Sequence, residues 1–401
     1  MRTVSAVCLL LLVHHSSSWT PGEVQIDGEP SGVMRSNGEP PDGHCTNRSS
    51  ATRANPSSAK RKIGSFPPPT IYLATATDRH QYVGLLALLR SLWRHVPVQN
   101  KVELHIFVAS RDVDCAAKLM KCAESISPSA EEMRSGVLIA GHADQEINQW
   151  RRRVVLHGVS RPNVAGGRKG DEVFFNFIRF HLPRLLPPPI ERAIWLDADT
   201  IIQGDISELY FDAFRQTRYQ GQEAGLAVVP RRFSRHFKLR EAVGIGDFRK
   251  LRKHIYVPAD LQMFNAGVLV FNLTMWRRNK LDEKAEGLIR LLHSLNITRF
   301  SRMSTTQSSQ LPMNLLFLNR NLGFLDRKWN FMNLAASKEE ISRGKILHWA
   351  GIKPWIAAGR HREWWLSYHS SHCCPAMNQF IHYPYMTPQA SMKTQAAACG
   401  C

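Results

Sequence analysis

The feature that most constrains the fold is an alternation of short apolar runs with helical patterns, which begins abruptly after Pro69. Residues 71–75 form an apolar, β-branched run typical of a buried strand, and apolar side chains over 82–92 then recur at helical spacing. Further strands are predicted over 102–110 and 137–140. This alternation favours a mostly parallel sheet whose strands are joined by crossover helices.

The later part of the chain continues the same pattern. Helices are predicted from about residue 112, over 173–186 and over 275–295, and strands over 193–196, 224–229 and 264–273. The helix over 173–186 should stop at the proline run that follows it, because proline cannot continue a helix. Residues 346–368 are predicted to be the last ordered piece.

The segments on either side of this domain have a different composition. Residues 1–19 place Arg2 before the apolar run VCLLLLV, which is too short to span a bilayer of ~30 Å and predicts a signal peptide, with a short membrane anchor as the alternative. Residues 20–68 are rich in Pro, Gly, Ser and charge, as expected of a disordered linker or stem. The ordered domain should span 69–368, followed by a Cys-containing tail over 369–401. The expected location is the secretory pathway, in the Golgi or ER lumen, with secretion as an alternative.

The cysteines are less decisive. Cys115 and Cys122 fall on one face of a predicted helix, where unpaired core thiols are the default interpretation. Four more cysteines crowd the tail, where they can form lumenal disulfides: Cys373, Cys374, Cys399 and Cys401. Their spacings match no zinc site, and their connectivity cannot be read from the sequence.

The formal net charge of +19 raises the question of nucleic-acid binding. The basic clusters are scattered, lack interleaved aromatic residues and match no nucleic-acid-binding fold, so we expect no nucleic-acid partner. A basic field can instead attract a nucleotide diphosphate or an anionic glycan, or it can be a plainly solvated surface.

The strongest local signal is an Asp-x-Asp motif, Asp197-Ala-Asp199, directly after an apolar strand. Ligands of open α/β sheets bind at the carboxyl ends of the strands. Two carboxylates this close repel each other unless a cation lies between them, and a hard divalent ion can hold both together with phosphate oxygens. The structural alternative is a solvated turn that caps the next helix.

A second signal is the segment from His348 to Trp355, HWAGIKPW. A lone histidine is more often a satisfied core residue than a ligand. Here it precedes Gly351, which allows close approach of backbone to an anion, and Lys353, which can neutralise phosphate. An imidazole ligand and a phosphate-binding lysine would complete one site with the two aspartates.

Five landmarks in order give the chain a family resemblance: 76–78 (ATD), 178–183 (IRFHLP), 195–205 (WLDADTIIQGD), 264–273 (FNAGVLVFNL) and 348–355. Over about 71–368 the chain resembles glycosyltransferase family 8, the retaining enzymes with an A-type nucleotide-sugar fold. It is nearest in pattern to the animal family 8 domain-containing proteins and the plant galacturonosyltransferase-like proteins. The resemblance implies an α/β fold, a single Rossmann-like A-type domain with a mixed, mostly parallel central sheet flanked by helices.

The resemblance also implies residue roles and a reaction. Mn²⁺ or another divalent cation would be held by Asp197, Asp199 and His348. The donor would be bound by Ala76, Asp78, Arg179, Gly351 and Lys353. The catalytic residues would be Asn265, facing the transferred sugar, and Gln310, on the reacting face of that sugar. The implied activity is transfer of a hexosyl or related sugar from a UDP-sugar to a glycan or glycoprotein acceptor, with retention of configuration and with front-face attack favoured. As structural alternatives, Asn265 would cap a turn and Gln310 would lie on a helix surface.

The chain departs from the family pattern at one position, and two other functions are weighed against glycosyl transfer. The relatives usually have two residues between the glycine and lysine of the late loop, whereas this chain has one, a shortening that can displace Lys353. A haloacid-dehalogenase-type phosphatase also uses Asp-x-Asp, but its motif needs Thr or Val where this chain has Ile201. A catalytically inactive glycosyltransferase-like lumenal binding protein is the stronger rival.

Overall fold

In the computed structural model every described residue belongs to the unit Ser65–Cys401. The described residues are 69–97, 99–125, 135–139, 152–160, 171–215, 223–231, 238–297, 309–318, 320, 322–332, 336–355, 361–368 and 373. The predictions for residues 1–19 and 20–68, and for most of the tail, lie outside them. Among the described helices, none has the length and apolar content needed to cross a membrane.

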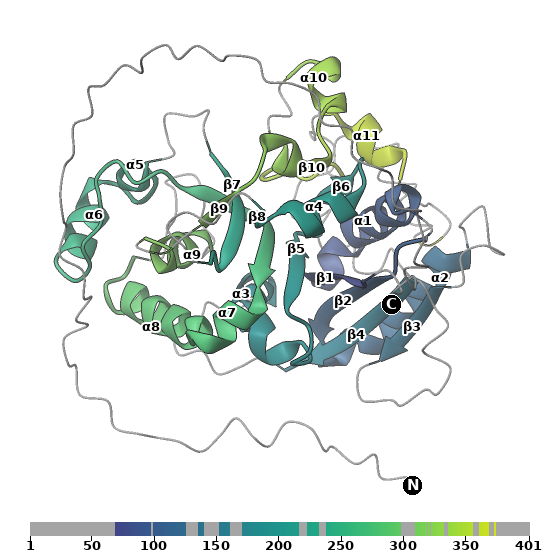
Figure 1. The fold of residues 1–401 in the computed structure, drawn as a ribbon, viewed down its shortest axis with the longest axis horizontal. Helices are drawn as coiled ribbons and strands as arrows, with labels where there is room; N and C mark the ends of the chain where they lie inside the picture. Colours follow the sequence, from purple (N-terminus) through teal and green to yellow (C-terminus); the bar gives the residue numbers. More distant parts are fainter. Residues whose placement is uncertain are drawn as a thin grey trace, which may run out of the picture. The chain divides into compact units, whose positions relative to one another are not determined.

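A mixed sheet of eight strands forms the centre of the described structure (Figure 1). Its spatial order is β3 (Ser135–Ile139), β4 (Arg152–Val159), β2 (Val102–Ala109), β1 (Ile71–Ala76), β5 (Arg192–Leu196), β8 (Phe264–Asn272), β7 (Leu226–Pro230) and β9 (Leu322–Phe324). Neighbouring strands from β3 to β5 are parallel, β8 is antiparallel to both β5 and β7, and β7 and β9 are parallel. This sheet confirms the predicted fold class.

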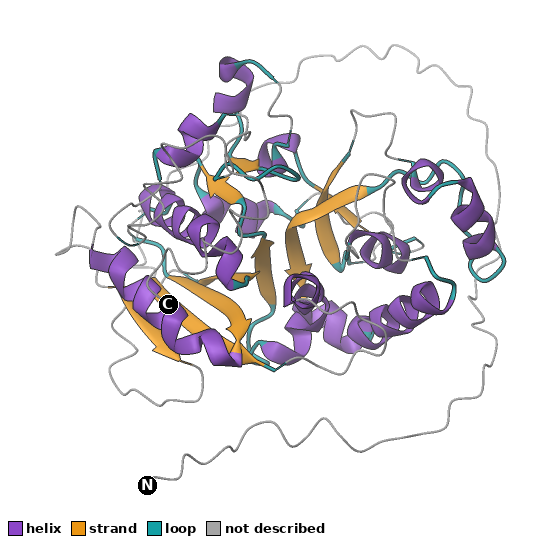
Figure 2. Cartoon of the chain, turned by 180° about the vertical axis from the view of Figure 1, so that it is seen from behind, coloured by secondary structure: helices purple, strands orange, loops and turns teal. Residues whose placement is uncertain are grey.

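Helices cover both faces of the sheet (Figure 2). On one face α1 (Tyr82–His95) and α2 (Val113–Ser125) pack on the apolar side chains of β1, β2 and β4. On the other face α3 (Asp171–Leu185), α7 (Leu273–Arg278), α8 (Leu281–Ser294) and α9 (Gln310–Leu316) enclose a second core. The strands alternate between the two cores, as a sheet buried on both sides requires.

The remaining elements lie around this core. The short helices are α4 (Ile206–Asp212), α5 (Leu239–Val243), α6 (Ile245–Arg252), α10 (Lys338–Ser342) and α11 (Arg362–Leu366). A separate two-stranded sheet pairs β6 (Thr200–Ile202) with β10 (Ile346–His348) in antiparallel register, which sets His348 opposite Thr200 (Figure 1). This small sheet joins two segments almost 150 residues apart.

Strand β4 and the region of the predicted helix over 275–295 differ from the predictions. Strand β4 was not predicted, because it begins with basic residues; the Arg152 guanidinium is nevertheless buried, where it donates to Val96 O (3.3 Å) and lies over the Trp93 ring. The helix predicted over 275–295 is two helices, α7 and α8. They are separated at Lys280, whose φ of 48° is a left-handed conformation that does not continue a helix.

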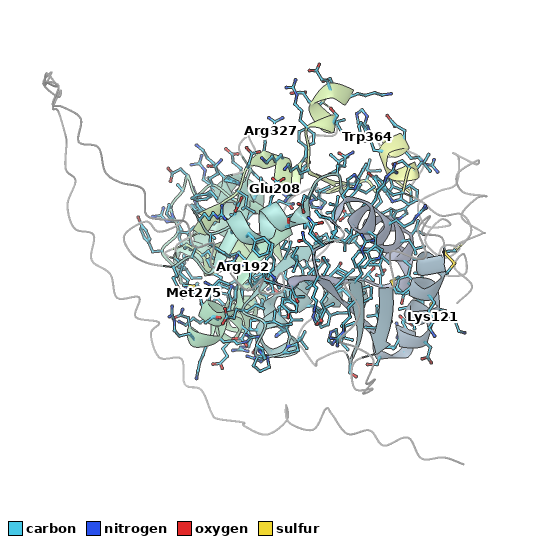
Figure 3. All side chains as sticks on the ribbon, turned by 45° about the vertical axis from the view of Figure 1, so that its right-hand side comes forward. Lys121, Arg192, Glu208, Met275, Arg327 and Trp364 are labelled. Atoms are coloured by element: carbon cyan, nitrogen blue, oxygen red, sulfur yellow. A yellow bond between two sulfur atoms is a disulfide. The ribbon has the colours of Figure 1, made fainter. Side chains whose placement is uncertain are left out.

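The prediction of unpaired core thiols at Cys115 and Cys122 is wrong. Cys122 of α2 forms a disulfide with Cys373, and Cys115 is disulfide-bonded as well. Figure 3 shows the disulfide region beside the labelled Lys121 of α2. A helix face can present a thiol to a distant segment as readily as to the core, and the spacing of cysteines along one helix does not separate these cases. The disulfide holds the start of the tail on the domain, since Cys373 is buried.

Candidate metal centre

The two aspartates lie in a turn that is fixed from several sides. Strand β5 ends at Leu196, and the turn that follows is closed by Thr200, whose N–H and hydroxyl donate to Asp197 O at 3.1 and 2.7 Å. The Asp197 N–H donates to Gly267 O in the neighbouring strand β8 (2.8 Å). Both aspartates are therefore held at the carboxyl end of a central strand, the position at which open α/β sheets bind ligands.

The small sheet of β6 and β10 brings His348 to this turn. The Trp349 N–H donates to Asp199 O (3.1 Å), and the His348 N–H donates to Phe331 O (3.1 Å). Backbone pairing thus brings the His348 imidazole to the aspartates. His348 is buried there, with 2% of its surface exposed.

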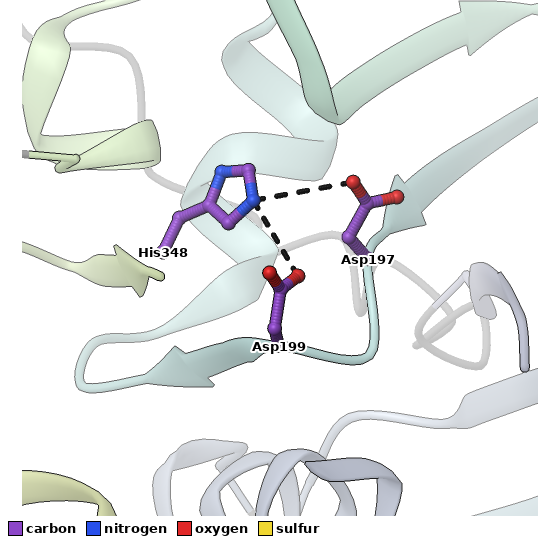
Figure 4. Close-up of side chains that lie close together, drawn as sticks. All are labelled: Asp197, Asp199 and His348. Atoms are coloured by element: carbon purple, nitrogen blue, oxygen red, sulfur yellow. Dashed lines mark ion pairs between the residues drawn. The ribbon is translucent and has the colours of Figure 1, made fainter. Parts of the chain in front are cut away.

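The three side chains converge around one point (Figure 4). His348 Nε2 lies 3.4 Å from Asp199 Oδ1 and 3.9 Å from Asp197 Oδ2. One ligand atom from each residue lies within 4.8 Å of the others. Two carboxylate oxygens and an imidazole nitrogen in this arrangement suit a divalent cation.

Two basic side chains bind the other oxygens of the aspartates. Arg179 of α3 donates to Asp197 Oδ1 (2.9 Å) and to the Ala266 carbonyl, and its guanidinium lies 4.7 Å from the centre of the Trp195 ring. The Lys353 ammonium contacts Asp199 Oδ2 and donates to Trp349 O (3.4 Å). The shortened loop therefore still brings Lys353 to the aspartates.

The electrostatics keep the buried aspartate ionised. Burial by itself would raise the pKa of Asp199, but the charges of Lys353 and His348 and their hydrogen bonds outweigh it and hold that pKa well below its usual range. Burial lowers the pKa of the Arg179 guanidinium, and the Asp197 carboxylate opposes this effect. The site thus combines two carboxyl side chains, of which Asp199 is held ionised, with two basic side chains.

A buried chain of amide hydrogen bonds stands behind the imidazole. His348 Nδ1 lies 2.8 Å from Asn330 Oδ1, and Asn330 Nδ2 donates to Asn265 Oδ1 (3.0 Å). The same Asn265 oxygen accepts from the Gly267 N–H (2.8 Å). Asn265 is 1% exposed, and the hydrogen bonds of its side-chain oxygen run to Gly267 and Asn330.

The remaining predicted site residues are Ala76, Asp78, Gly351 and Gln310, and the first two lie at the carboxyl end of β1, beside β5. The register of β1 with β5 pairs Ala74 with Trp195, so Ala76, the last residue of β1, comes level with Asp197 and the buried Asp78 follows it. Gly351 has φ 137°, a conformation that side chains other than glycine rarely adopt. Gln310 is the first residue of α9, and its carbonyl accepts from Asn314 (2.8 Å).

Sequence reasoning missed three residues that shape the site. Asn330 gave no periodic or motif signal. Trp195 was read as part of a strand, yet its indole N–H donates to Asp197 Oδ1 (2.8 Å). Gly267 had a usable signal, since an isolated glycine inside a strand suggests close approach of another group. A Cβ at Gly267 would lie 2.8 Å from both ring nitrogens of His348.

Comparison with known proteins agrees with the family resemblance. The family model described as Glycosyl transferase family 8 matches residues 72–359. Glycosyltransferase 8 domain-containing protein 1 of Xenopus tropicalis is 30% identical over 203 residues, 47% of this chain and 53% of that protein. Probable galacturonosyltransferase-like 9 of Arabidopsis thaliana is 25% identical over 309 residues, 75% of this chain and 70% of that protein. The match to the animal relative thus spans about half of that protein's length.

Solved structures resemble the chain only distantly. Mouse xyloside xylosyltransferase 1 aligns with a TM-score of 0.46 and 15% identity, covering 71% of this chain and 98% of that chain. GlyE of Streptococcus pneumoniae aligns with a TM-score of 0.44 and 17% identity, covering 81% of this chain and 63% of that chain. The fold class therefore rests on the sheet topology and on the family model.

Proposed function

The chain belongs to glycosyl transferase family 8, and from this premise we propose that it transfers a hexosyl or related sugar from a UDP-sugar donor to a glycan or glycoprotein acceptor. The observation that carries the proposal is the convergence of Asp197, Asp199 and His348 from distant parts of the chain. Two of these three side chains are buried, and burial of a carboxylate beside an imidazole without a compensating charge would be costly.

The residues fit a divalent cation such as Mn²⁺. Each aspartate has one oxygen bound by a basic side chain, while the oxygens nearest to His348 Nε2 are Asp199 Oδ1 and Asp197 Oδ2. When bound, the cation would hold the donor diphosphate and neutralise the charge that develops on it as the sugar departs.

The charge balance favours binding of the cation together with the donor. Asp197 and Asp199 contribute two negative charges, and Arg179 and Lys353 contribute two positive charges, so this group of side chains is close to neutral. A divalent cation alone would leave an uncompensated buried charge, which is costly. A divalent cation that arrives with a nucleotide-sugar diphosphate carries almost no net charge, and the site can accept the pair.

Other residues would act on the donor directly. The Lys353 ammonium lies where it can exchange its contact with Asp199 for a phosphate oxygen and stabilise the leaving group. Ala76 and Asp78, at the same edge of the sheet, would line the uridine pocket, and Gly351 would allow backbone N–H groups to approach phosphate. Gln310 would face the transferred sugar, as would the amide nitrogen of Asn265, whose oxygen is bonded to Gly267 and Asn330. We propose retention by front-face attack of the acceptor hydroxyl.

We also propose that the protein works in the secretory pathway, in the Golgi or ER lumen, after targeting by residues 1–19 as a signal peptide or short anchor. The Cys122–Cys373 disulfide supports this location, because disulfides persist in oxidising compartments and are rare in the cytosol.

The test is a donor screen that measures release of UDP, with Mn²⁺ and after chelation. We expect turnover of at least one UDP-sugar that needs a divalent cation and is lost in Asp199→Ala. Asp247→Ala is the matched control, since Asp247 makes only an exposed ion pair with Lys250, worth at most about 1 kcal/mol. Equal turnover in wild type and Asp199→Ala would contradict the assigned site. No turnover with any donor, alongside glycan binding, would favour the inactive binding protein.

A further inference from the structure

The hydrogen-bond chain behind His348 has an unambiguous starting point. The oxygen and nitrogen of an asparagine amide are normally assigned by inference, because they look alike. Here the Gly267 N–H is a backbone group that can only donate, so the Asn265 atom that lies 2.8 Å from it must be the acceptor oxygen. The orientation of the Asn265 amide is thereby fixed.

The orientation of the Asn265 amide determines that of the Asn330 amide, which in turn determines which nitrogen of the His348 imidazole carries the proton. The Asn330 group that lies 3.0 Å from Asn265 Oδ1 must be its donor NH₂, which leaves Asn330 Oδ1 toward His348. Because Asn330 Oδ1 can only accept, the His348 Nδ1 at 2.8 Å must carry the proton. Nε2 is then the nitrogen presented to the two aspartates.

Burial makes any other arrangement of these hydrogen bonds costly. Asn265, Asn330 and His348 are each at most 2% exposed, so water cannot readily replace a lost partner. A flip of either amide would set two donors or two acceptors against each other in a buried place, at a cost of about 1–3 kcal/mol. Gly267 closes the other side of the ring, since even a methyl group there would overlap it.

We propose that Asn330 is a positioning residue which, anchored through Asn265 to the Gly267 N–H, fixes the proton of His348 on Nδ1 and so dedicates Nε2 to the divalent cation. The cation-binding role of His348 rests on the proposed function, whereas the position of the proton does not. Asn330 touches neither cation nor sugar in this scheme and acts only through the imidazole.

The first test reads the proton directly in the metal-free full chain. Two-dimensional ¹H–¹⁵N NMR of the histidine side chains, with His348 assigned from the His348→Gln spectrum, should show a proton on Nδ1 in the wild type. Asn330→Asp keeps an acceptor and should keep that proton. Asn330→Leu has a similar volume but no acceptor, and the Nδ1–H signal should be lost. A wild-type His348 without a proton on Nδ1, or an unchanged signal in Asn330→Leu, would overturn the proposal.

The second test measures Mn²⁺ binding by electron paramagnetic resonance, with and without UDP. Asn330→Leu should weaken binding about 10- to 100-fold, as is typical when the partner of a ligating histidine is lost, whereas Asn330→Asp, which keeps the acceptor for the Nδ1 proton but loses the donor to Asn265 Oδ1, should weaken it less. Asn314→Leu is the matched control, because this equally buried amide bonds to Phe264 and Gln310 instead of His348. Equal weakening in the Asn314 and Asn330 leucine variants would reduce Asn330 to a packing residue and overturn the proposal.

The two tests also separate this proposal from the proposed function. If wild-type protein binds no Mn²⁺ but carries the Nδ1 proton and loses it in Asn330→Leu, the orientation of His348 stands and the metal-dependent activity falls. If Mn²⁺ binds and the proton is on Nε2, the activity stands and the role of Asn330 falls.

Discussion

Replacing Gly267 by alanine should remove metal binding while leaving the fold largely intact. The new Cβ would lie 2.8 Å from both His348 ring nitrogens, and closer still to Cε1. Ordinary carbon contacts lie at about 3.5–4.0 Å, so the ring must retreat by roughly 1 Å or more. Metal–ligand distances tolerate only about 0.2 Å, so Nε2 would leave the coordination position. The overpacking itself should cost about 1–3 kcal/mol of unfolding free energy.

The assay compares this variant with a second glycine-to-alanine change. Gly287 lies in helix α8, and a Cβ there meets no atom within 4 Å, so Gly287→Ala should be neutral or more stable by about 0.5–1 kcal/mol. We expect Gly267→Ala to lower the Mn²⁺ affinity measured with UDP by at least about 100-fold, beyond the usual effect of losing an outer partner, and to lower the melting temperature by a few °C. A Gly267→Ala protein that melts near wild type and binds Mn²⁺ with unchanged affinity would show that the imidazole does not have to move.

Three further predictions concern the surroundings of the site and the stability of the domain. Gly84→Ala would place its Cβ 2.5 Å from both Ala198 O and the Trp355 ring, so it should shift the aspartate turn, lower stability by about 1–3 kcal/mol and weaken Mn²⁺ binding; wild-type affinity would contradict this. Burial first, and the charge of His105 second, lower the pKa of His157 to about 3 against an opposing effect of Glu103, so between pH 6.5 and 3 the unfolded chain binds a proton that the folded chain does not. Stability should therefore decrease as the pH is lowered through this window, by up to about 1.4 kcal/mol per pH unit, and His157→Gln should reduce this slope in denaturant titrations; equal slopes would count against it. Replacing both Cys122 and Cys373 by serine should cost about 2–4 kcal/mol, seen as a lower melting temperature, whereas melting unchanged from wild type would show that the link does not stabilise the fold.

Local pattern determined much of this protein. Strand ends, helix periodicity and the proline stop at 187–189 are properties of short segments, and the structure places β1, β2, α3, β5 and β8 within a few residues of the predicted ranges. The sequence also located Asp197 and Asp199 correctly at the end of a buried strand, because a polar pair after an apolar run marks a strand's carboxyl end.

Tertiary contacts decided the rest. Arg152 is buried in strand β4 because it finds partners inside the fold, and Cys122 is bonded because Cys373 lies next to it, although neither residue type indicates its partner in the sequence. His348 reaches the aspartates through the pairing of β6 with β10, and Asn330 reaches His348 through an amide chain that starts at Gly267. Apart from the Asn265–Gly267 bond, these contacts join residues 18 to about 250 positions apart, which no local periodicity records.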